Sequence, residues 1–146
     1  MSGFDASIAH LMDAYKAAAH ARDVEAFMLL YDPGARVFDA WGTWSYEGAA
    51  AWRTAVESWF DSLGNEQVEV SFDEIQVSSS ADFAAVTAIV TYAGLSATGV
   101  RLRSMQNRIT WVLALRGQSP RIVHEHTSAP VAHQDMKAIL HRVPVT

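Results

Sequence analysis

The sequence lacks cysteine and contains few charged residues. The absence of cysteine among its 146 residues excludes disulfides, thiolate metal sites and cysteine nucleophiles. Charged side chains make up 18% of the chain, and 16 acidic against 11 basic residues give a net charge of −5. Because the basic residues are scattered and form no stripe, the sequence predicts a protein with no nucleic-acid partner.

Long apolar runs and nucleotide-binding motifs are also missing. No apolar run approaches the roughly 18 residues that suggest a membrane-spanning helix. Residues 1–5 have neither the basic nor the apolar region of a secretory signal, so the sequence predicts a cytoplasmic protein without a membrane partner. No Gly-x-Ser-x-Gly elbow or Gly-rich phosphate loop is present, which argues against a serine nucleophile and against nucleotide chemistry.

The residues that are present predict one α+β domain. Apolar residues make up 50% of the chain and aromatic residues 10%. Apolar positions three to four residues apart predict three helices, over residues 5–21, 24–31 and 49–63. Runs rich in β-branched residues predict four strands, over residues 66–77, 83–92, 101–115 and 121–128.

The predicted elements are segregated along the chain, with the helices before the main strands. A short extended segment, 35–39, and an aromatic loop, 40–46, join the second helix to the third. A polar and partly helical tail follows residue 131. This order predicts three helices packed on one face of a strongly curved, mostly antiparallel sheet, which forms a cone with a pocket inside.

His124 and His126 are the first candidates for a functional site. They stand two residues apart in a predicted strand, so both imidazoles project from the same sheet face. Three roles fit this spacing: a metal pair completed by Asp39 or Glu125, a lining of the pocket, or a structural role in hydrogen bonds. Glu125 points to the opposite face and is poorly placed as a ligand, and no metal or other cofactor is predicted.

Asp39 and Tyr15 are the next candidates. Asp39 follows a short apolar strand and precedes the aromatic loop, where desolvation would raise its pKa and make it a usable base. The alternative is an exposed aspartate that caps the loop. Tyr15 lies at helical spacing among apolar residues, so burial in the core competes with a catalytic role that depends on Asp39 facing it.

Ligand contacts are predicted from tryptophan and arginine residues. Trp41 and Trp44 lie in the loop at the expected mouth of the cone, whereas Trp59 and Trp111 are expected in its wall. Arg108 stands among apolar strand residues. It either binds an anionic group of the ligand, such as a carboxylate, or pairs with an acid such as Asp73 or Glu125.

The chain resembles the nuclear-transport-factor-2-like superfamily, and within it the SnoaL-like group and the association domain of calcium/calmodulin-dependent kinase II. The motifs that carry the resemblance are Asp32-Pro33, Val37-Phe38-Asp39, Glu47-Gly48 and the ending Ile122-Val-His-Glu-His-Thr-Ser-Ala-Pro130. The resemblance spans roughly residues 5–131. It implies a curved-sheet cone with an internal cavity and a homodimer formed through the outer sheet face, with no single function fixed by the fold.

Ketosteroid isomerase and the SnoaL-type cyclases are the enzymes to which the chain is similar. The resemblance to the isomerase implies a general base at Asp39 and a hydroxyl donor at Tyr15. The second acid of that enzyme does not carry over, because Trp111 stands near its position. The resemblance to the cyclases implies that an aspartate in the cavity acts as acid and base.

Together these features predict a protein that binds an apolar or aromatic small molecule and catalyses a proton transfer of the isomerase or cyclase type. Asp39 is the expected base, and Tyr15, His124 or His126 are the expected donors. The alternative is a non-enzymatic dimerisation module with a vestigial cavity. A cupin-like metal enzyme is opposed by the helical first third of the chain.

Overall fold

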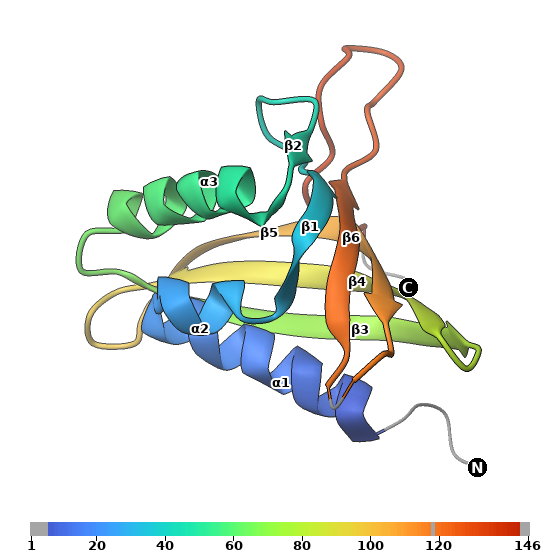
Figure 1. Cartoon of the computed structure of the whole chain (residues 1–146). Coiled ribbons are helices and arrows are strands. Elements are labelled where there is room, and N and C mark those ends of the chain that lie inside the picture. The colour runs from blue at the N-terminus through green and yellow to red at the C-terminus, as the bar shows by residue number, and fades with distance from the viewer. Residues whose placement is uncertain (1–5, 118, 144–146) are drawn as a thin grey trace.

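The computed structural model describes residues 6–117 and 119–143. Three helices cover one side of a six-stranded sheet whose strand order is β2-β1-β6-β5-β4-β3 (Figure 1). The helices are α1 (Ala6–Ala21), α2 (Val24–Met28) and α3 (Ala49–Ser62). The strands are β1 (Tyr31–Phe38), β2 (Tyr46–Glu47), β3 (Gln67–Ser79), β4 (Phe83–Leu95), β5 (Arg101–Ala114) and β6 (Arg121–Ser128).

The predicted α+β architecture is confirmed. β1 pairs with β6 in parallel, and all other neighbouring strands are antiparallel. No helix in the described part of the chain is both long enough and apolar enough to cross a membrane.

The core lies between the helices and the inner face of the sheet. Along β4, Ala84, Val86, Ala88 and Val90 are buried while the intervening residues face outwards, as strand alternation requires. An aromatic cluster fills the space under the helices. In it the Tyr15 ring lies 4.8 Å from the Phe27 ring and 5.4 Å from the Trp111 ring, measured between centroids.

A β-bulge bends β3. The register with β4 shifts between Asp73 and Gln76, and Glu74 there has a positive φ of 54°. The extra residue changes the inward-facing series from Val68, Val70 and Phe72 to Ile75 and Val77. Such a bulge increases local bending and twist, which helps the sheet to curl around the helices.

The second helix and the tail differ from the prediction. α2 ends at Met28, and Tyr31 begins β1 instead of closing a helix. Residues 132–141 form turns held by a bridge between Val131 and Ala138, and no helix is present there.

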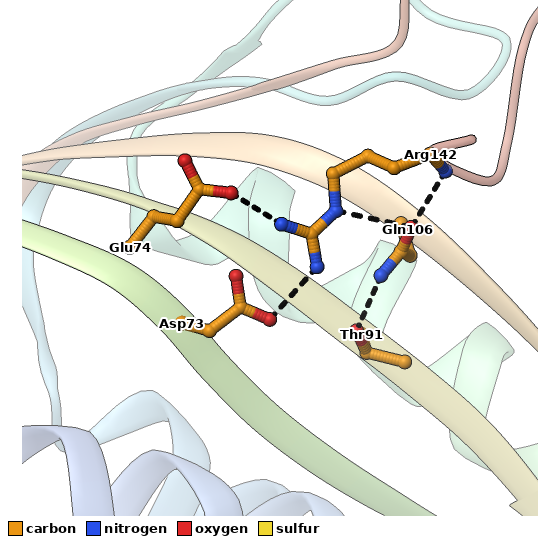
Figure 2. A network of polar contacts seen from close by, with 5 residues as sticks. All are labelled: Asp73, Glu74, Thr91, Gln106 and Arg142. Carbon is orange, nitrogen blue, oxygen red and sulfur yellow. Dashed lines mark hydrogen bonds and ion pairs between the residues drawn. The ribbon is translucent and has the colours of Figure 1, made fainter. Parts of the chain in front are cut away.

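The tail is fastened across the outer face of the sheet by Arg142 (Figure 2). Its guanidinium pairs with Asp73 at 2.9 Å and with Glu74 in the β3 bulge. Its backbone N–H donates to Gln106 Oε1 at 2.8 Å, and Gln106 Nε2 donates in turn to the Thr91 hydroxyl at 3.2 Å. The Gln106 backbone N–H donates to the carbonyl of Leu140, where β6 no longer covers the edge of β5.

We expect Arg142→Gln to loosen the tail without unfolding the domain. Exposed ion pairs contribute about 1 kcal/mol or less, so the free energy of unfolding should change by no more than that. Amide hydrogen exchange at Gln106 should nevertheless become faster, because its acceptor belongs to the tail. Lys137→Gln removes a charge from the same tail without removing an ion pair and is the matched control. Unchanged protection of the Gln106 amide would contradict this role of Arg142.

Candidate functional site

A cavity of about 560 Å³ lies between α3, α1 and the inner face of the sheet. This volume is in the range of small-molecule sites. Six aromatic side chains line it: Tyr15, Trp41, Tyr46, Trp52, Trp59 and Tyr92. Three charged side chains of the described residues line it as well, namely Asp39, Arg103 and Glu125. The cavity is therefore largely apolar, with acidic groups at defined positions.

Asp39 and Tyr15 both line this cavity, as the catalytic prediction requires. Asp39 follows the last residue of β1, and its Oδ1 accepts a hydrogen bond from the Thr127 hydroxyl on β6 at 3.1 Å. Burial raises the pKa of the Asp39 carboxyl, while hydrogen bonds from Thr127 and from the backbone of the following loop oppose that rise. A partly buried carboxylate with a raised pKa is a stronger base than an exposed one.

Glu125 is the acid of the site that the sequence prediction missed. It is 1% exposed, lines the cavity from β6 and stands directly opposite Trp111 in the β5–β6 ladder. Its Oε1 accepts from the Tyr31 hydroxyl at 2.5 Å and from the Trp111 indole N–H at 2.9 Å. Both donors converge on Oε1, and none of the residues that the structure describes forms a hydrogen bond with Oε2.

The environment of Glu125 favours its neutral form. Burial raises the pKa of this carboxyl to about 7, with a further upward contribution from the negative charge of Asp39. The hydrogen bonds from Tyr31 and Trp111 act in the opposite direction, and burial outweighs them. A neutral Glu125 whose Oε1 accepts two hydrogen bonds would carry its proton on Oε2, where it can be donated into the cavity.

Tyr15 and Tyr92 form a pair of hydroxyl groups on the cavity wall. Their oxygen atoms lie 2.7 Å apart, and either one can be the donor. Burial raises the pKa of both phenols, so both keep their protons at neutral pH. One hydroxyl proton forms the hydrogen bond between the two oxygens. The second hydroxyl proton can then be donated to a ligand atom that accepts a hydrogen bond.

The predicted tryptophan contacts divide into two groups. Trp41 and Trp59 line the cavity, whereas Trp111 lies behind Glu125 and positions it through the indole N–H. Trp44 differs from the prediction, since it is 96% exposed and borders a groove on the outer side of the loop. Trp52 also lines the cavity, and its buried indole N–H makes no hydrogen bond of normal geometry.

Arg108 lies on the outer face of the sheet and does not reach the cavity. β5 turns its odd-numbered residues inwards, including Asn107 and Ile109, so Arg108 points away. Its Nε donates to the Ser128 hydroxyl at 3.0 Å, and neither of the predicted acidic partners pairs with it. The cavity cation is Arg103 instead, four residues before Asn107 on the same strand.

His124 and His126 share one face, as their spacing predicts, but that face is the outer one. The two rings lie 4.9 and 5.5 Å from the Phe38 ring. The His124 Nδ1 is 2.7 Å from the carbonyl oxygen of Arg36, which suits an N–H donor there. His126 borders the outer groove of Trp44, to which Asp39 also contributes, and neither histidine lines the inner cavity.

No three His, Asp or Glu side chains come together as a metal-binding group in the part of the chain that the structure describes. The pairing of Glu125 with Tyr31 and Trp111 directs this acid into the sheet interior, on the opposite side from the two imidazoles. The structure thus brings Tyr15, Asp39 and Glu125 to one cavity and leaves the histidines outside it.

Comparison with known families agrees with this architecture. The model of the SnoaL-like domain matches residues 8–132, which is most of the chain. The chain belongs to the SnoaL-like domain family. No protein of curated function matches the sequence.

Solved structures with the same fold cover nearly all of this SnoaL-like domain. An NTF2-like protein of unknown function from Pseudomonas putida has a TM-score of 0.81 at 19% identity, covering 95% of each chain. A protein from Xanthomonas campestris, named for the calcium/calmodulin-dependent protein kinase II association domain, has a TM-score of 0.74 at 18% identity. That match covers 88% of this chain and 89% of the other.

A ketosteroid isomerase-like protein from Erwinia carotovora has a TM-score of 0.65 at 21% identity, covering 84% of this chain and 93% of the other. These likenesses confirm the predicted fold, while the family is shown by the domain match over residues 8–132. At these sequence identities the likenesses support the fold only. The evidence for the chemistry of the SnoaL-like domain lies in its own cavity.

Proposed function

We propose that this SnoaL-like domain binds an apolar or aromatic small molecule that carries a carbonyl group, and that it catalyses a proton transfer next to that carbonyl. The observation that carries the proposal is the presence of two carboxyl groups of different character, Asp39 and Glu125, on the wall of one aromatic cavity. Carboxyls whose environments differ in this way can act as base and acid at the same pH.

Binding is supported by the composition of the cavity wall. Aromatic side chains offer apolar contact to a flat ligand, and such pairs contribute about 0.5 to 1.5 kcal/mol each beyond simple burial. The polar groups that face the cavity are few, so they can fix the orientation of one carbonyl. The Glu125 Oε2 and the free proton of the Tyr15–Tyr92 pair are the donors available to its oxygen.

The proposed step moves one proton and shifts two electron pairs. The Asp39 carboxylate takes a proton from the carbon beside the carbonyl, the electrons of that C–H bond form a carbon–carbon double bond, and the π electrons of the carbonyl move to its oxygen to give an enolate. Neutral Glu125 donates a hydrogen bond to this oxygen and stabilises its charge. Return of the proton from Asp39 to another carbon gives an isomer, whereas attack of the enolate carbon on a second carbonyl closes a ring, and the alkoxide formed there takes the proton back from Asp39.

A neutral Glu125 is better suited to this role than an ionised one. An ionised carboxylate would repel the developing negative charge, and it would have no proton to donate. The raised pKa keeps a large share of Glu125 protonated near neutral pH, while Asp39, whose carboxylate receives a hydrogen bond from Thr127, is ionised at lower pH.

The non-enzymatic association module is less well supported than this proposal. A module that serves only in assembly gains nothing from an open cavity or from a buried acid, because ionising a buried carboxyl costs stability even when hydrogen bonds offset part of that cost. The Glu125 carboxyl and the 560 Å³ of space beside it favour a bound ligand. Homodimerisation through the outer sheet face stays a prediction and is compatible with either function.

The experiment that tests the proposal is deuterium uptake by a simple aromatic ketone in D₂O, followed by NMR. The ketone β-tetralone (2-tetralone) is a suitable probe because it is small, nearly flat and uncharged. The SnoaL-like domain should accelerate exchange of the protons beside the carbonyl at catalytic concentrations. Exchange no faster than with the same concentration of free carboxylate would overturn the proposed chemistry.

A matched pair of loop variants tests where the ligand binds. Trp41 and Trp44 are both exposed and lie in the same loop, but Trp41 alone of the two lines the cavity. Trp41→Ala should weaken binding of para-phenylphenol about three- to tenfold, which corresponds to one lost aromatic contact. Trp44→Ala should leave the affinity unchanged. Calorimetric titration measures both, and equal effects of the two variants would contradict the assignment of the cavity as the site.

A further inference from the structure

The charges that line the cavity are distributed unevenly. Asp39 and Glu125 are the acidic lining residues, and Glu125 is almost completely buried. Arg103, the basic lining residue of the described chain, is exposed, as are Ser58 and Ser62 on α3. Side chains that both line a cavity and contact solvent mark its opening. The rim therefore carries one positive charge, at Arg103, and the exposed Trp41, two residues after Asp39, marks another part of the opening.

Arg103 is placed at this rim by the β4–β5 ladder. It pairs with Gly94, and it has the same strand parity as the inward-facing Asn107 and Trp111. A Cβ atom added at Gly94 would lie 3.4 Å from the Arg103 Cζ, so the guanidinium lies over the glycine. A side chain as small as alanine at position 94 would only touch the guanidinium, so this contact locates Arg103 over β4.

The distance between the rim and the acids suits an elongated ligand. Asp39 accepts a hydrogen bond from Thr127, which pairs with Ile109 on β5. Arg103 precedes Ile109 by six residues, which corresponds to about 20 Å along an extended strand before side-chain reach and sheet curvature shorten the gap. A ligand of two linked rings can therefore extend from the carboxyls towards Arg103.

We propose that Arg103 selects ligands that carry an anionic group, such as a carboxylate, at the end remote from the group that faces Asp39 and Glu125. This inference rests on the proposed binding of a small molecule in the same cavity. An anion at the inner end would be repelled by Asp39 and would lose hydration without gaining a cation. At the outer end the same anion meets a guanidinium and remains partly hydrated.

Glu66 holds the Arg103 side chain in place through an ion pair. The Arg103 Nη2 and the Glu66 Oε1 lie 2.6 Å apart, with side chains that are 61% and 27% exposed. An exposed ion pair of this kind is weak, so a ligand carboxylate can share or replace the interaction at small cost. Glu66 does not line the cavity and competes with the ligand for the same guanidinium.

Three related ligands test the inference: para-phenylphenol, the same biphenyl with a carboxylate at its far para position, and the corresponding neutral carboxamide. Each keeps a hydroxyl at the inner end, and the acid and the amide differ only in the charge at the outer end. The acid should bind about tenfold more tightly than the amide, as expected for a charge-assisted hydrogen bond. The preference should decrease as salt is added, because the pair is exposed.

Arg103→Gln should abolish the preference for the acid over the amide, and Arg103→Lys should retain part of it. Glu66→Gln should increase the preference, because it removes the competing carboxylate. Arg108→Gln is the matched control, since Arg108 is on the same strand but faces outwards, and it should leave the preference intact.

The possible outcomes separate the two proposals. Tight binding of para-phenylphenol with equal affinities for acid and amide would overturn the role of Arg103 and leave the proposed function standing. The role of Arg103 would also be wrong if Arg108→Gln reduced the preference as much as Arg103→Gln. Failure of all three ligands to bind would overturn the role of Arg103, and together with a lack of catalysed exchange of the tetralone it would overturn the proposed function as well.

Discussion

Replacement of Asp39 by asparagine should slow deuterium uptake by the tetralone at least about 100-fold. General bases contribute about 10² to 10⁴ to the rate of proton transfer, and asparagine has a similar shape but no basic oxygen pair. Thr127 can still donate its hydroxyl proton to the amide oxygen, so the local structure should persist. The measurement is the initial exchange rate at saturating ketone, compared with the affinity for para-phenylphenol.

Affinity separates a lost base from a damaged site. If Asp39 acts in the chemical step, the exchange rate should decrease far more than the affinity does. His126→Gln is the control, because His126 borders the outer groove next to Asp39 but does not line the cavity. Equal exchange rates for wild type and Asp39→Asn would remove Asp39 from the mechanism, whatever happened to binding.

The position of the acidic group could not be read from the sequence because strand β6 is irregular. Ile122 faces inwards, and strict alternation from it would turn His124 and His126 inwards as well. The ladder with β5 shifts between Leu113–Ile122 and Val112–His124, so Val123 is an extra residue. This bulge reverses the phase and turns Glu125 towards the cavity.

The prediction therefore identified the shared face of the histidines correctly but could not decide which side it was. The prediction that Glu125 faces the opposite side from the histidines was also correct. A glutamate between two histidines, however, gave no sign that it would be buried. One signal was present in β5, where Trp111 occupies the position at which the isomerase-like acid was expected. The acid stands directly across the ladder from that tryptophan, on the neighbouring strand.

Most of the fold could be predicted because its elements follow regular spacing. The inward series of β5 and the buried face of α3 repeat at the expected intervals. β1 was harder, since Pro33 and Gly34 disfavour strands. The pairing of β1 with β6 is interrupted between Tyr31 and Arg36, so Pro33 lies where no ladder hydrogen bond is needed.

Glu125→Gln should change the pH dependence of both stability and activity. The folded protein raises the pKa of Glu125 from 4.5 to about 7, so it binds this proton more tightly than the unfolded chain does. The resulting stabilisation is fully present below pH 4.5 and is lost as pH rises towards 7. At about 1.4 kcal/mol for each pKa unit, the loss is on the order of 3 kcal/mol.

Glutamine cannot ionise and preserves the geometry of a neutral glutamic acid. Its carbonyl oxygen can accept from Tyr31 and Trp111, and its amide can donate into the cavity. The free energy of unfolding, measured with denaturant from pH 4.5 to 8, should therefore fall less steeply in Glu125→Gln than in wild type. At pH 8 the variant should be the more stable protein, because it avoids a buried charge.

The same substitution separates the catalytic role of Glu125 from its structural role. Wild-type exchange should increase with pH as Asp39 ionises and decrease near pH 7 as Glu125 loses its proton. In Glu125→Gln the decrease near pH 7 should disappear, because the amide remains a donor. Glu125→Leu, which has no donor, should be slow at every pH. A wild-type decrease that survives in Glu125→Gln must come from another group, and the acid role of Glu125 would then be wrong.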